Sequence, residues 1–322
     1  MALGALPLTA VAQFGGRGTP PPPPKSNFGG VQIGVITYSF RQGIKAEDLI
    51  PTINKLGINA VELMSNHAEA LAGAPATPNF FGGARGPGRG PGGPGRGRPQ
   101  LTPEQQAAMQ AAREELNKWR ASVPMDAFKA VRKKFDDANI DLKILCYNLA
   151  ASATDEEIDY SFRMAQALGV NAISSSSTVS VAKRVAPIAE KYKLLWGGHG
   201  HDAIDDPEQF ATLESYAKIM SFGKYIGVNL DIGHFTAAGY DAVSYIKEHH
   251  DRITNLHLKD RKKGRGPNTR WGEGDTPIKD VLLLLKKEKY PFPADIEYEY
   301  FGTDPVIEVA KCLEYCRDIL IA

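Results

Sequence analysis

Short apolar stretches alternate with longer amphipathic segments along most of the chain. The short stretches are rich in β-branched and apolar residues, which favours strands, and the segments between them carry apolar residues at spacings of three and four, which favours helices. The pattern predicts eight strands, at residues 31–38, 59–64, 141–147, 170–176, 193–198, 226–232, 252–258 and 294–300. Eight strand–helix units most simply close into an α/β structure, a single-domain (β/α)8 TIM barrel spanning residues 31–322.

Two of the predicted helices have recognisable starts. One begins after Thr154, a good N-cap followed by acidic residues, and stops at Gly169. The other, within residues 205–220, has Pro207 at a first-turn position and is expected to begin there. A doubly wound open sheet is the alternative fold, but the first strand is followed by SFRQGI rather than by a glycine-rich phosphate turn.

Two segments fall outside the barrel pattern. The first is residues 1–30, where MALGALPLTAVAQ ends in the small-residue pattern that signal peptidases cleave and is followed by a polyproline spacer. The positively charged start of a signal peptide is missing. We therefore predict an exported, periplasmic protein with a truncated signal peptide, and a cytoplasmic protein is the alternative. The second segment, at about residues 71–100, is rich in Gly, Arg and Pro and is predicted to be a disordered insertion.

Charge and composition narrow the class of partner. The 38 basic and 37 acidic residues give a net charge of +1, so no nucleic-acid partner is expected, although Arg-Gly-Gly tracts can bind RNA. No apolar stretch approaches the ~20 residues of a membrane-spanning helix. The three cysteines have no zinc or disulfide spacing and are interpreted as packing residues. A small-molecule substrate is the simplest expectation.

Polar residues gather where the predicted strands end. The carboxyl ends of barrel strands meet at one rim, where active sites lie. Residues two apart share a face of a strand, so His257 and Lys259 in NLHLK are expected to point inward together, as are Glu297 and Glu299 in IEYE. The set comprises Glu62, His199, His201, Asp231, His234, His257, Lys259, Glu297 and Glu299, and it includes four of the seven histidines.

Burying so many ionisable groups in one small volume is costly unless they pair with one another or hold a cation. Two imidazoles and two carboxylates form a mixed nitrogen and oxygen set that suits manganese, cobalt, iron or zinc better than calcium. We therefore predict one divalent metal ion, with a salt-bridged polar plug as the alternative. The predicted ligands are His199, Asp231, His257 and Glu297.

Three motifs, in order and on consecutive strands, carry a resemblance to a known family. They are NLDIGH, HLKDR followed by WGEGDTPI, and IEYEY. With them, the chain from Val31 to its C-terminal helix, apart from the insertion, resembles the xylose-isomerase-like barrel superfamily, often labelled sugar phosphate isomerase/epimerase. The resemblance implies one divalent metal, commonly Mn²⁺, with Co²⁺, Zn²⁺, Fe²⁺ and Mg²⁺ as other options.

The same resemblance implies which residues hold the metal. Asp231, His257 and Glu297 match ligand positions, whereas the family's Glu-Asn-His string on the fifth strand is replaced here by HGH. His199 would then replace the glutamate ligand, and His201 would keep the place of the histidine that contacts substrate. A mechanism with two metal-bound carboxylates therefore cannot be assumed.

The chemistry that the resemblance implies is proton abstraction next to a sugar carbonyl through an enediolate. Reprotonation elsewhere makes an isomerase or epimerase, which we predict; expulsion of a neighbouring group makes a lyase that cleaves 3-keto-glycosides, the close alternative. A non-catalytic sugar-binding barrel and a metal-dependent endonuclease are less favoured. The catalytic candidates are Glu297, His201, Glu62 and Lys259, and the substrate-binding candidates are His234, Glu299 and Arg261.

Overall fold

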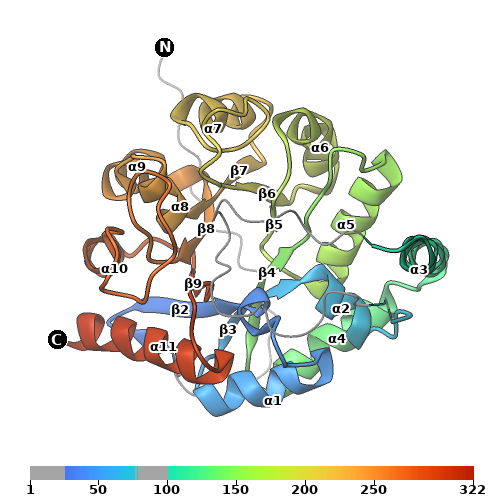
Figure 1. Ribbon diagram of the computed structural model, residues 1–322, viewed down its shortest axis with the longest axis horizontal. Coiled ribbons are helices and arrows are strands. Elements are labelled where there is room, and N and C mark those ends of the chain that lie inside the picture. The colour runs from blue at the N-terminus through green and yellow to red at the C-terminus, as the bar shows by residue number, and fades with distance from the viewer. Residues whose placement is uncertain (1–25, 77, 79–100) are drawn as a thin grey trace, which may run out of the picture.

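The computed structural model describes residues 26–76, 78 and 101–322 (Figure 1). The predicted leader up to residue 25 and most of the predicted Gly/Arg insertion lie outside the described residues, so both stay predictions. Residues 71–76 are described and continue directly from a helix, where Ala74 N donates a hydrogen bond to Glu69 O.

Within the described residues, eight parallel strands pair in chain order and close into a barrel (Figure 1). The first and last of them pair in parallel through Ile33 and Ala294, which completes the ring. This confirms the predicted α/β barrel. The strands are β2 (Val31–Ile36), β3 (Ala60–Met64), β4 (Asp141–Cys146), β5 (Ala172–Ser175), β6 (Leu195–His199), β7 (Ile226–Asp231), β8 (Ile253–Leu258) and β9 (Ala294–Ile296).

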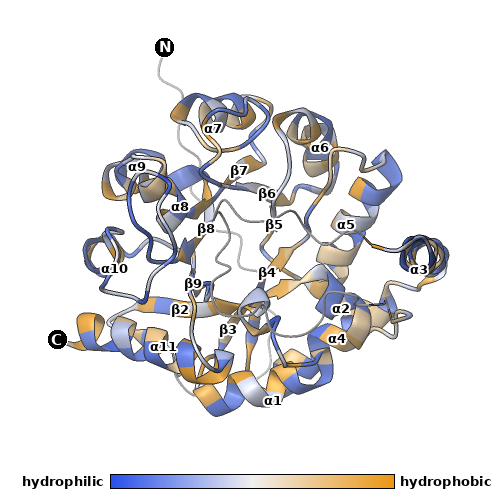
Figure 2. Cartoon of the chain, in the orientation of Figure 1, coloured by the Kyte–Doolittle hydropathy of each residue, from blue (hydrophilic) through white to orange (hydrophobic). Residues whose placement is uncertain are grey.

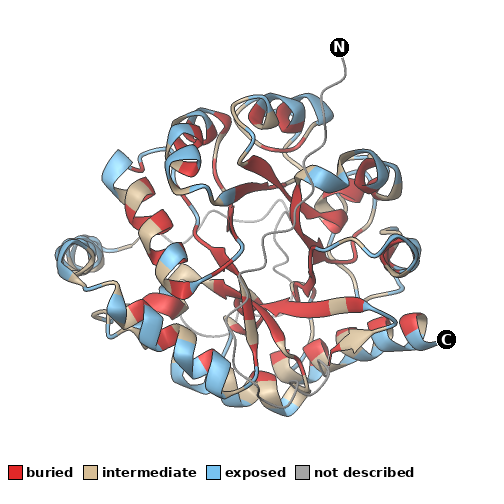
Figure 3. Ribbon diagram, turned by 180° about the vertical axis from the view of Figure 1, so that it is seen from behind, coloured by how far each residue is buried: buried red, intermediate tan, exposed pale blue. Residues whose placement is uncertain are grey.

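A ring of helices that carry both hydrophobic and hydrophilic residues surrounds the strands (Figure 2). Apart from the helix 103–122, which has no buried residue, these helices turn buried faces inward and exposed faces outward (Figure 3). In the helix 126–137, for example, Phe128, Val131 and Phe135 form a buried stripe at helical spacing. The helices are α1 (Ala46–Leu56), α2 (Ser65–Leu71), α3 (Pro103–Ser122), α4 (Asp126–Asp137), α5 (Asp155–Leu168), α6 (Val179–Tyr192), α7 (Leu213–Met220), α8 (Ile232–Ala237), α9 (Ala242–His249), α10 (Ile278–Glu288) and α11 (Pro305–Ile321), with short 3₁₀ turns η1 (Thr37–Phe40) and η2 (His250–Arg252).

The two predicted helix starts had different outcomes. The Thr154 side chain accepts a hydrogen bond from Glu157 N at 3.2 Å, and Gly169 closes α5 with a φ of 64°, as predicted. The start at Pro207 is wrong, because α7 begins only at Leu213. Thr212 caps that helix through a reciprocal capping box, while the preceding segment turns so that Phe210 is fully buried.

Residues just before Val31, the predicted start of the barrel, also pack against it. A two-residue strand, β1 (Asn27–Phe28), pairs antiparallel with β2, and the buried Ser26 donates a hydrogen bond to Ile33 O at 2.7 Å. All three cysteines are buried and unpaired, which agrees with their interpretation as packing residues. Among the described helices, none is long and apolar enough to cross a membrane.

Candidate metal centre

A cavity of about 240 Å³ opens at the carboxyl ends of the strands. Most of the polar residues predicted to gather at this rim line it. The lining residues are Ile36, Tyr38, Met64, Cys146, Asn148, Ser176, His199, His201, His234, His257, Lys259, Glu297 and Glu299.

The four predicted metal ligands come together here: His199, His257 and Glu297 line the cavity, and Asp231 lies fully buried close to them. One donor atom from each of His199, Asp231, His257 and Glu297 can be chosen so that all four lie within 4.8 Å of one another. Ligand atoms about 2.0–2.2 Å from a metal lie within about 4.4 Å of each other, so small side-chain adjustments suffice. All four residues are buried, and two imidazole nitrogens with two carboxylate oxygens are a donor set for a divalent transition metal.

Three of the donor atoms make ion pairs and no contact of ideal hydrogen-bond geometry. Asp231 Oδ2, His257 Nδ1 and Glu297 Oε2 are buried and have no partner of hydrogen-bond geometry in the part of the chain that the structure describes, although Lys259 Nζ lies 2.9 Å from both carboxylate oxygens and His257 Nδ1 lies 3.0 Å from Glu297 Oε2. Buried polar atoms rarely stay unsatisfied, because losing water without a replacement partner is costly. The residues present therefore fit a divalent metal ion.

Neighbouring residues fix which nitrogen of each candidate imidazole ligand faces the centre. His199 Nδ1 donates to Asn229 Oδ1 at 2.5 Å, which leaves its Nε2 for a ligand. His257 Nε2 donates to Glu62 Oε2 at 2.6 Å, which turns its Nδ1 toward Glu297 Oε2 at 3.0 Å. Partners of this kind orient metal-binding histidines and raise their basicity.

Glu62 lies beneath the centre and does not line the cavity. It is fully buried, and its carboxylate accepts hydrogen bonds from Ser174 Oγ and, at 2.8 Å, from Asn255 Nδ2, in addition to His257. The contact of Glu62 with the centre therefore runs through His257.

Asp231 links the centre to the helix that follows it. Its Oδ1 accepts a hydrogen bond from His234 N at 2.7 Å and so caps α8, while Oδ2 faces the centre. Burial raises the pKa of Asp231, and Lys259 acts in the opposite direction.

Lys259 reaches into the same group of carboxylates. Its Nζ lies 2.9 Å from Asp231 Oδ2, 2.9 Å from Glu297 Oε2 and 2.7 Å from Glu299 Oε2. Burial alone would lower the pKa of Lys259, but the three carboxylates raise it well above its ordinary value. Burial raises the pKa of Glu297, and this effect is outweighed by Lys259 and His257, which bring that pKa well below its usual range.

Two further histidines line the cavity above the candidate ligands. Burial lowers the pKa of His201 to about 3, and its Nε2 lies 3.5 Å from Ser176 Oγ. Burial, with Lys259 adding to it, lowers the pKa of His234 well below its usual range. Both imidazoles are therefore neutral at pH 7.

Arg261 holds His234 from behind and is not among the residues that line the cavity. Its guanidinium donates to His234 Nδ1 and to Gly266 O, and it pairs with Asp202 Oδ2 at 2.9 Å. Since Nδ1 accepts a hydrogen bond, the proton of the neutral ring is on Nε2. The Nε2–H of His234 is thus available as a hydrogen-bond donor, and it lies 3.9 Å from Asp231 Oδ2.

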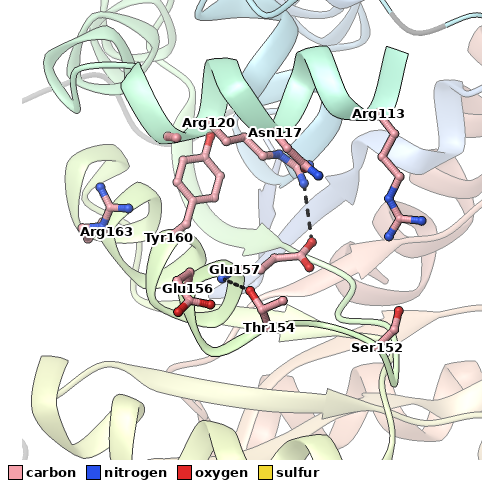
Figure 4. Close-up of a pocket in the computed structure, with 10 residues that line it drawn as sticks. Arg113, Asn117, Arg120, Ser152, Thr154, Glu156, Glu157, Tyr160 and Arg163 are labelled. Carbon is pink, nitrogen blue, oxygen red and sulfur yellow. Dashed lines mark hydrogen bonds and ion pairs between the residues drawn. The ribbon is translucent and has the colours of Figure 1, made fainter. Parts of the chain in front are cut away.

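A second cavity, of about 330 Å³, lies between α3 and the start of α5 (Figure 4). Arg120 points from α3 toward Glu157 at 3.5 Å (Figure 4). It also binds Glu69 through two nitrogens at 2.7 and 3.0 Å. The lining mixes three arginines with two glutamates and includes no histidine or cysteine among the described residues. These contacts join α3 to the barrel and assemble no catalytic group.

The sequence model of the xylose isomerase-like TIM barrel family matches residues 107–317, which are 211 of the 322 residues. The chain belongs to the xylose isomerase-like TIM barrel family. The recognition made from the motifs is therefore confirmed. No curated protein sequence matches the chain significantly.

Solved structures show the same fold at low sequence identity. The probable 3-DHS dehydratase AsbF of Bacillus anthracis is 13% identical, with a TM-score of 0.59 over 91% of this chain and 99% of that one. A sugar phosphate isomerase/epimerase of Parabacteroides distasonis is 16% identical, with a TM-score of 0.56 over 91% and 96%. The IolI protein, solved with a zinc atom, is 14% identical, with a TM-score of 0.58 over 90% and 98%.

This xylose isomerase-like barrel also uses three polar residues that the sequence interpretation passed over: Asn229, Asn255 and Asp295. Each precedes a predicted ligand by two residues on its own strand, so strand alternation alone would have placed them on the inner face. Asp202, which binds Arg261, lies in an irregular loop whose sequence carries no periodic signal.

Proposed function

We propose that the protein is a divalent-metal-dependent sugar isomerase or epimerase that moves a proton next to a carbonyl through an enediolate. The observation that carries the proposal is the buried group of four donor residues, three of which line a cavity that also exposes two neutral histidines. The isomerase/epimerase neighbour supports the reaction class. The substrate is a small sugar or keto-sugar, in keeping with a cavity of about 240 Å³.

His199, Asp231, His257 and Glu297 would hold the metal, with Mn²⁺ as our first choice. A bound divalent ion would polarise the carbonyl and stabilise negative charge on the substrate oxygens. The zinc atom of the IolI protein supports a transition metal at such a site.

His201 is our choice of general base. Of the other three catalytic candidates, Glu62 lies outside the cavity, Glu297 is a proposed ligand whose charged form is stabilised by Lys259, and Lys259 is kept protonated by its three carboxylate partners. His201 lines the cavity, is neutral, and so keeps a lone pair that can accept a proton. Negative charge developing on the substrate would favour protonation of its ring, and the ring would then return the proton to a neighbouring carbon.

His234 would polarise a substrate oxygen by hydrogen bonding. Its proton is on Nε2 because Arg261 occupies Nδ1, and a neutral imidazole is a suitable donor to an oxygen that gains charge. Glu299 and Tyr38 would bind hydroxyl groups at the cavity wall. Arg261 and Glu62 become positioning residues, which changes the roles predicted for them from the sequence.

Cleavage of 3-keto-glycosides by elimination is the second candidate function. The cavity-facing carboxylates Glu297 and Glu299 both follow β9, so they do not provide one carboxylate on each face of a substrate. A single base with a separate hydrogen-bond donor serves elimination as well as isomerisation, and a probable dehydratase is among the structural neighbours. An exported enzyme, as the leader suggests, would meet glycosides.

Solvent exchange tests the proposal. Keto-sugars and 3-keto-glycosides are incubated in D₂O with the protein and Mn²⁺, and NMR follows the hydrogen next to the carbonyl. We expect metal-dependent exchange that falls about 10²- to 10⁴-fold in His201→Ala. A rearranged sugar identifies an isomerase, and an unsaturated product identifies a lyase. Absence of exchange with every substrate in a metal-loaded protein would contradict both.

A further inference from the structure

We propose that Lys259 and Glu299 form a counter-ion pair that sets the metal affinity of the centre. In this arrangement Lys259 competes with the metal for Asp231 and Glu297, and Glu299 weakens that competition by holding Lys259. The inference rests on the proposed metal site and concerns how that site is regulated.

The contacts of Lys259 divide into two kinds. Two of its three carboxylate partners, Asp231 and Glu297, belong to the candidate ligand set, each at 2.9 Å. The third, Glu299 at 2.7 Å, is outside that set and makes the shortest of the three contacts. One ammonium group therefore bridges the ligands and a carboxylate that is not a candidate ligand.

Charge makes Lys259 and a metal competitors. The Lys259 side chain is 2% exposed, and Asp231 and Glu297 are 0% and 7% exposed, so solvent screens these charges weakly. A divalent ion among the ligands would lie close to the ammonium group and repel it. Glu299 can compensate Lys259 without contributing to the ligand set, which lowers the cost of admitting the metal.

The contacts of Lys259 are shared among three carboxylates. Its Nζ is buried and lies within 3 Å of one oxygen of each of them. Lys259 can therefore keep Glu299 as a partner when a metal takes Asp231 and Glu297.

The fold also fixes the stem of Lys259. A Cβ on Gly233 would lie 2.8 Å from Lys259 O and 2.9 Å from Lys259 Cβ, so only glycine lets α8 pass this close to the lysine. Residue 233 is the glycine of the NLDIGH motif. The position of Lys259, just after β8, therefore depends on Gly233, which follows the neighbouring strand β7.

A double-mutant cycle on metal affinity tests the inference. Mn²⁺ dissociation constants are measured by titration for the wild type, Lys259→Met, Glu299→Gln and the double variant. We expect Lys259→Met to bind Mn²⁺ more tightly and Glu299→Gln to bind it about tenfold more weakly. The double variant should match Lys259→Met, because Glu299 acts only through Lys259.

Additive effects would overturn the inference, since they would mean that Glu299 acts on the metal independently of Lys259. Weaker binding by Lys259→Met would overturn it too. Wild-type protein that binds no Mn²⁺ would instead remove the proposed function, so the two failures are distinguishable. The double variant loses one positive and one negative charge. Because its buried charges stay closer to balance, it should fold even if Lys259→Met does not.

Thermal unfolding gives a readout that needs neither substrate nor activity. Lys259→Met leaves buried carboxylates without their cation, so its metal-free Tm should fall below that of the wild type. Mn²⁺ should then raise the Tm of Lys259→Met by more than it raises that of the wild type. Equal metal-induced shifts in the two proteins would contradict competition.

Discussion

The imidazole rings of the centre are held by partners that choose the nitrogen each ring presents. Asn229 fixes His199, Glu62 fixes His257 and Arg261 fixes His234. Each partner is itself buried or held by further contacts, so the cavity receives rings of fixed orientation. This is why a carboxylate or guanidinium outside the cavity can still control what happens inside it.

Glu62→Gln should weaken Mn²⁺ binding about 10- to 100-fold, because His257 loses the carboxylate that orients it. Isothermal titration measures the change. Glu69→Gln is the matched control: Glu69 is also a buried, charge-paired glutamate, but its partner is Arg120 on α3. An unchanged affinity in Glu62→Gln, or an equal loss in Glu69→Gln, would show that Glu62 does not act through His257.

Arg261→Gln should reduce kcat by about 10- to 10³-fold with less effect on metal content, because His234 loses the partner that keeps its proton on Nε2. Arg265→Gln serves as the control, since Arg265 pairs with the exposed Asp205 at 2.9 Å. Steady-state kinetics measures kcat, and elemental analysis of the same samples measures metal content, so the two effects are separated. Normal kcat in Arg261→Gln would remove the proposed role of His234.

His67 provides a test by pH away from the centre. Burial lowers the pKa of His67 to about 4, and its Nδ1 lies 3.0 Å from Thr37 Oγ1. Its folded pKa is below the unfolded value of about 6.5, so stability is fully present above pH 6.5 and is lost as the pH falls toward 4, by at most about 3 kcal/mol. Chemical denaturation at several pH values should show a shallower loss in His67→Gln. Parallel curves would contradict this.

At the scale of elements, strands were far more predictable than the segments between them. Every predicted strand is present, because β-branched runs and alternation report on local burial. The start of α7 was mispredicted at Pro207, since the choice between loop and helix depends on Phe210 packing inside. The polar layer under the centre was passed over, although Asn255 and Asp295 share the inner face with the predicted ligands.

That polar layer depends on close backbone approach at Gly34 in β2. A Cβ there would lie 2.0 Å from Asp295 Oδ1. Burial and the charge of Glu62 already raise the pKa of Asp295 to about 7, so the layer is sensitive to any displacement. The glycine therefore makes room for a carboxyl group inside the barrel.

Gly34→Ala should cost about 1–3 kcal/mol of unfolding free energy through overpacking, and it should also weaken metal binding because Asn255 contacts Glu62. Gly223→Ala is the control, since its nearest neighbour would be 3.9 Å away. Denaturant unfolding of the two variants gives the comparison. Equal stability would mean that Asp295 moves aside freely.

At the scale of the whole molecule, closing the barrel brings four consecutive strand ends together. Residues that are nearly a hundred positions apart in sequence, such as His199 and Glu297, become neighbours because β6 to β9 pair in order. The motifs therefore sufficed to predict which four residues come together once the barrel was inferred. The tautomers, the buried place of Glu62 and the triple contact of Lys259 depend on side-chain packing, which periodicity does not encode.

The most direct test of the account is the metal content of the purified protein, compared by elemental analysis with that of an Asp231→Ala, His257→Ala double variant after both are dialysed against Mn²⁺ and then buffer. Circular dichroism establishes that the variant is folded. The account predicts about one ion per chain in the wild type and none in the variant. A wild type without bound metal, or a folded variant that retains it, would contradict the metal centre described above.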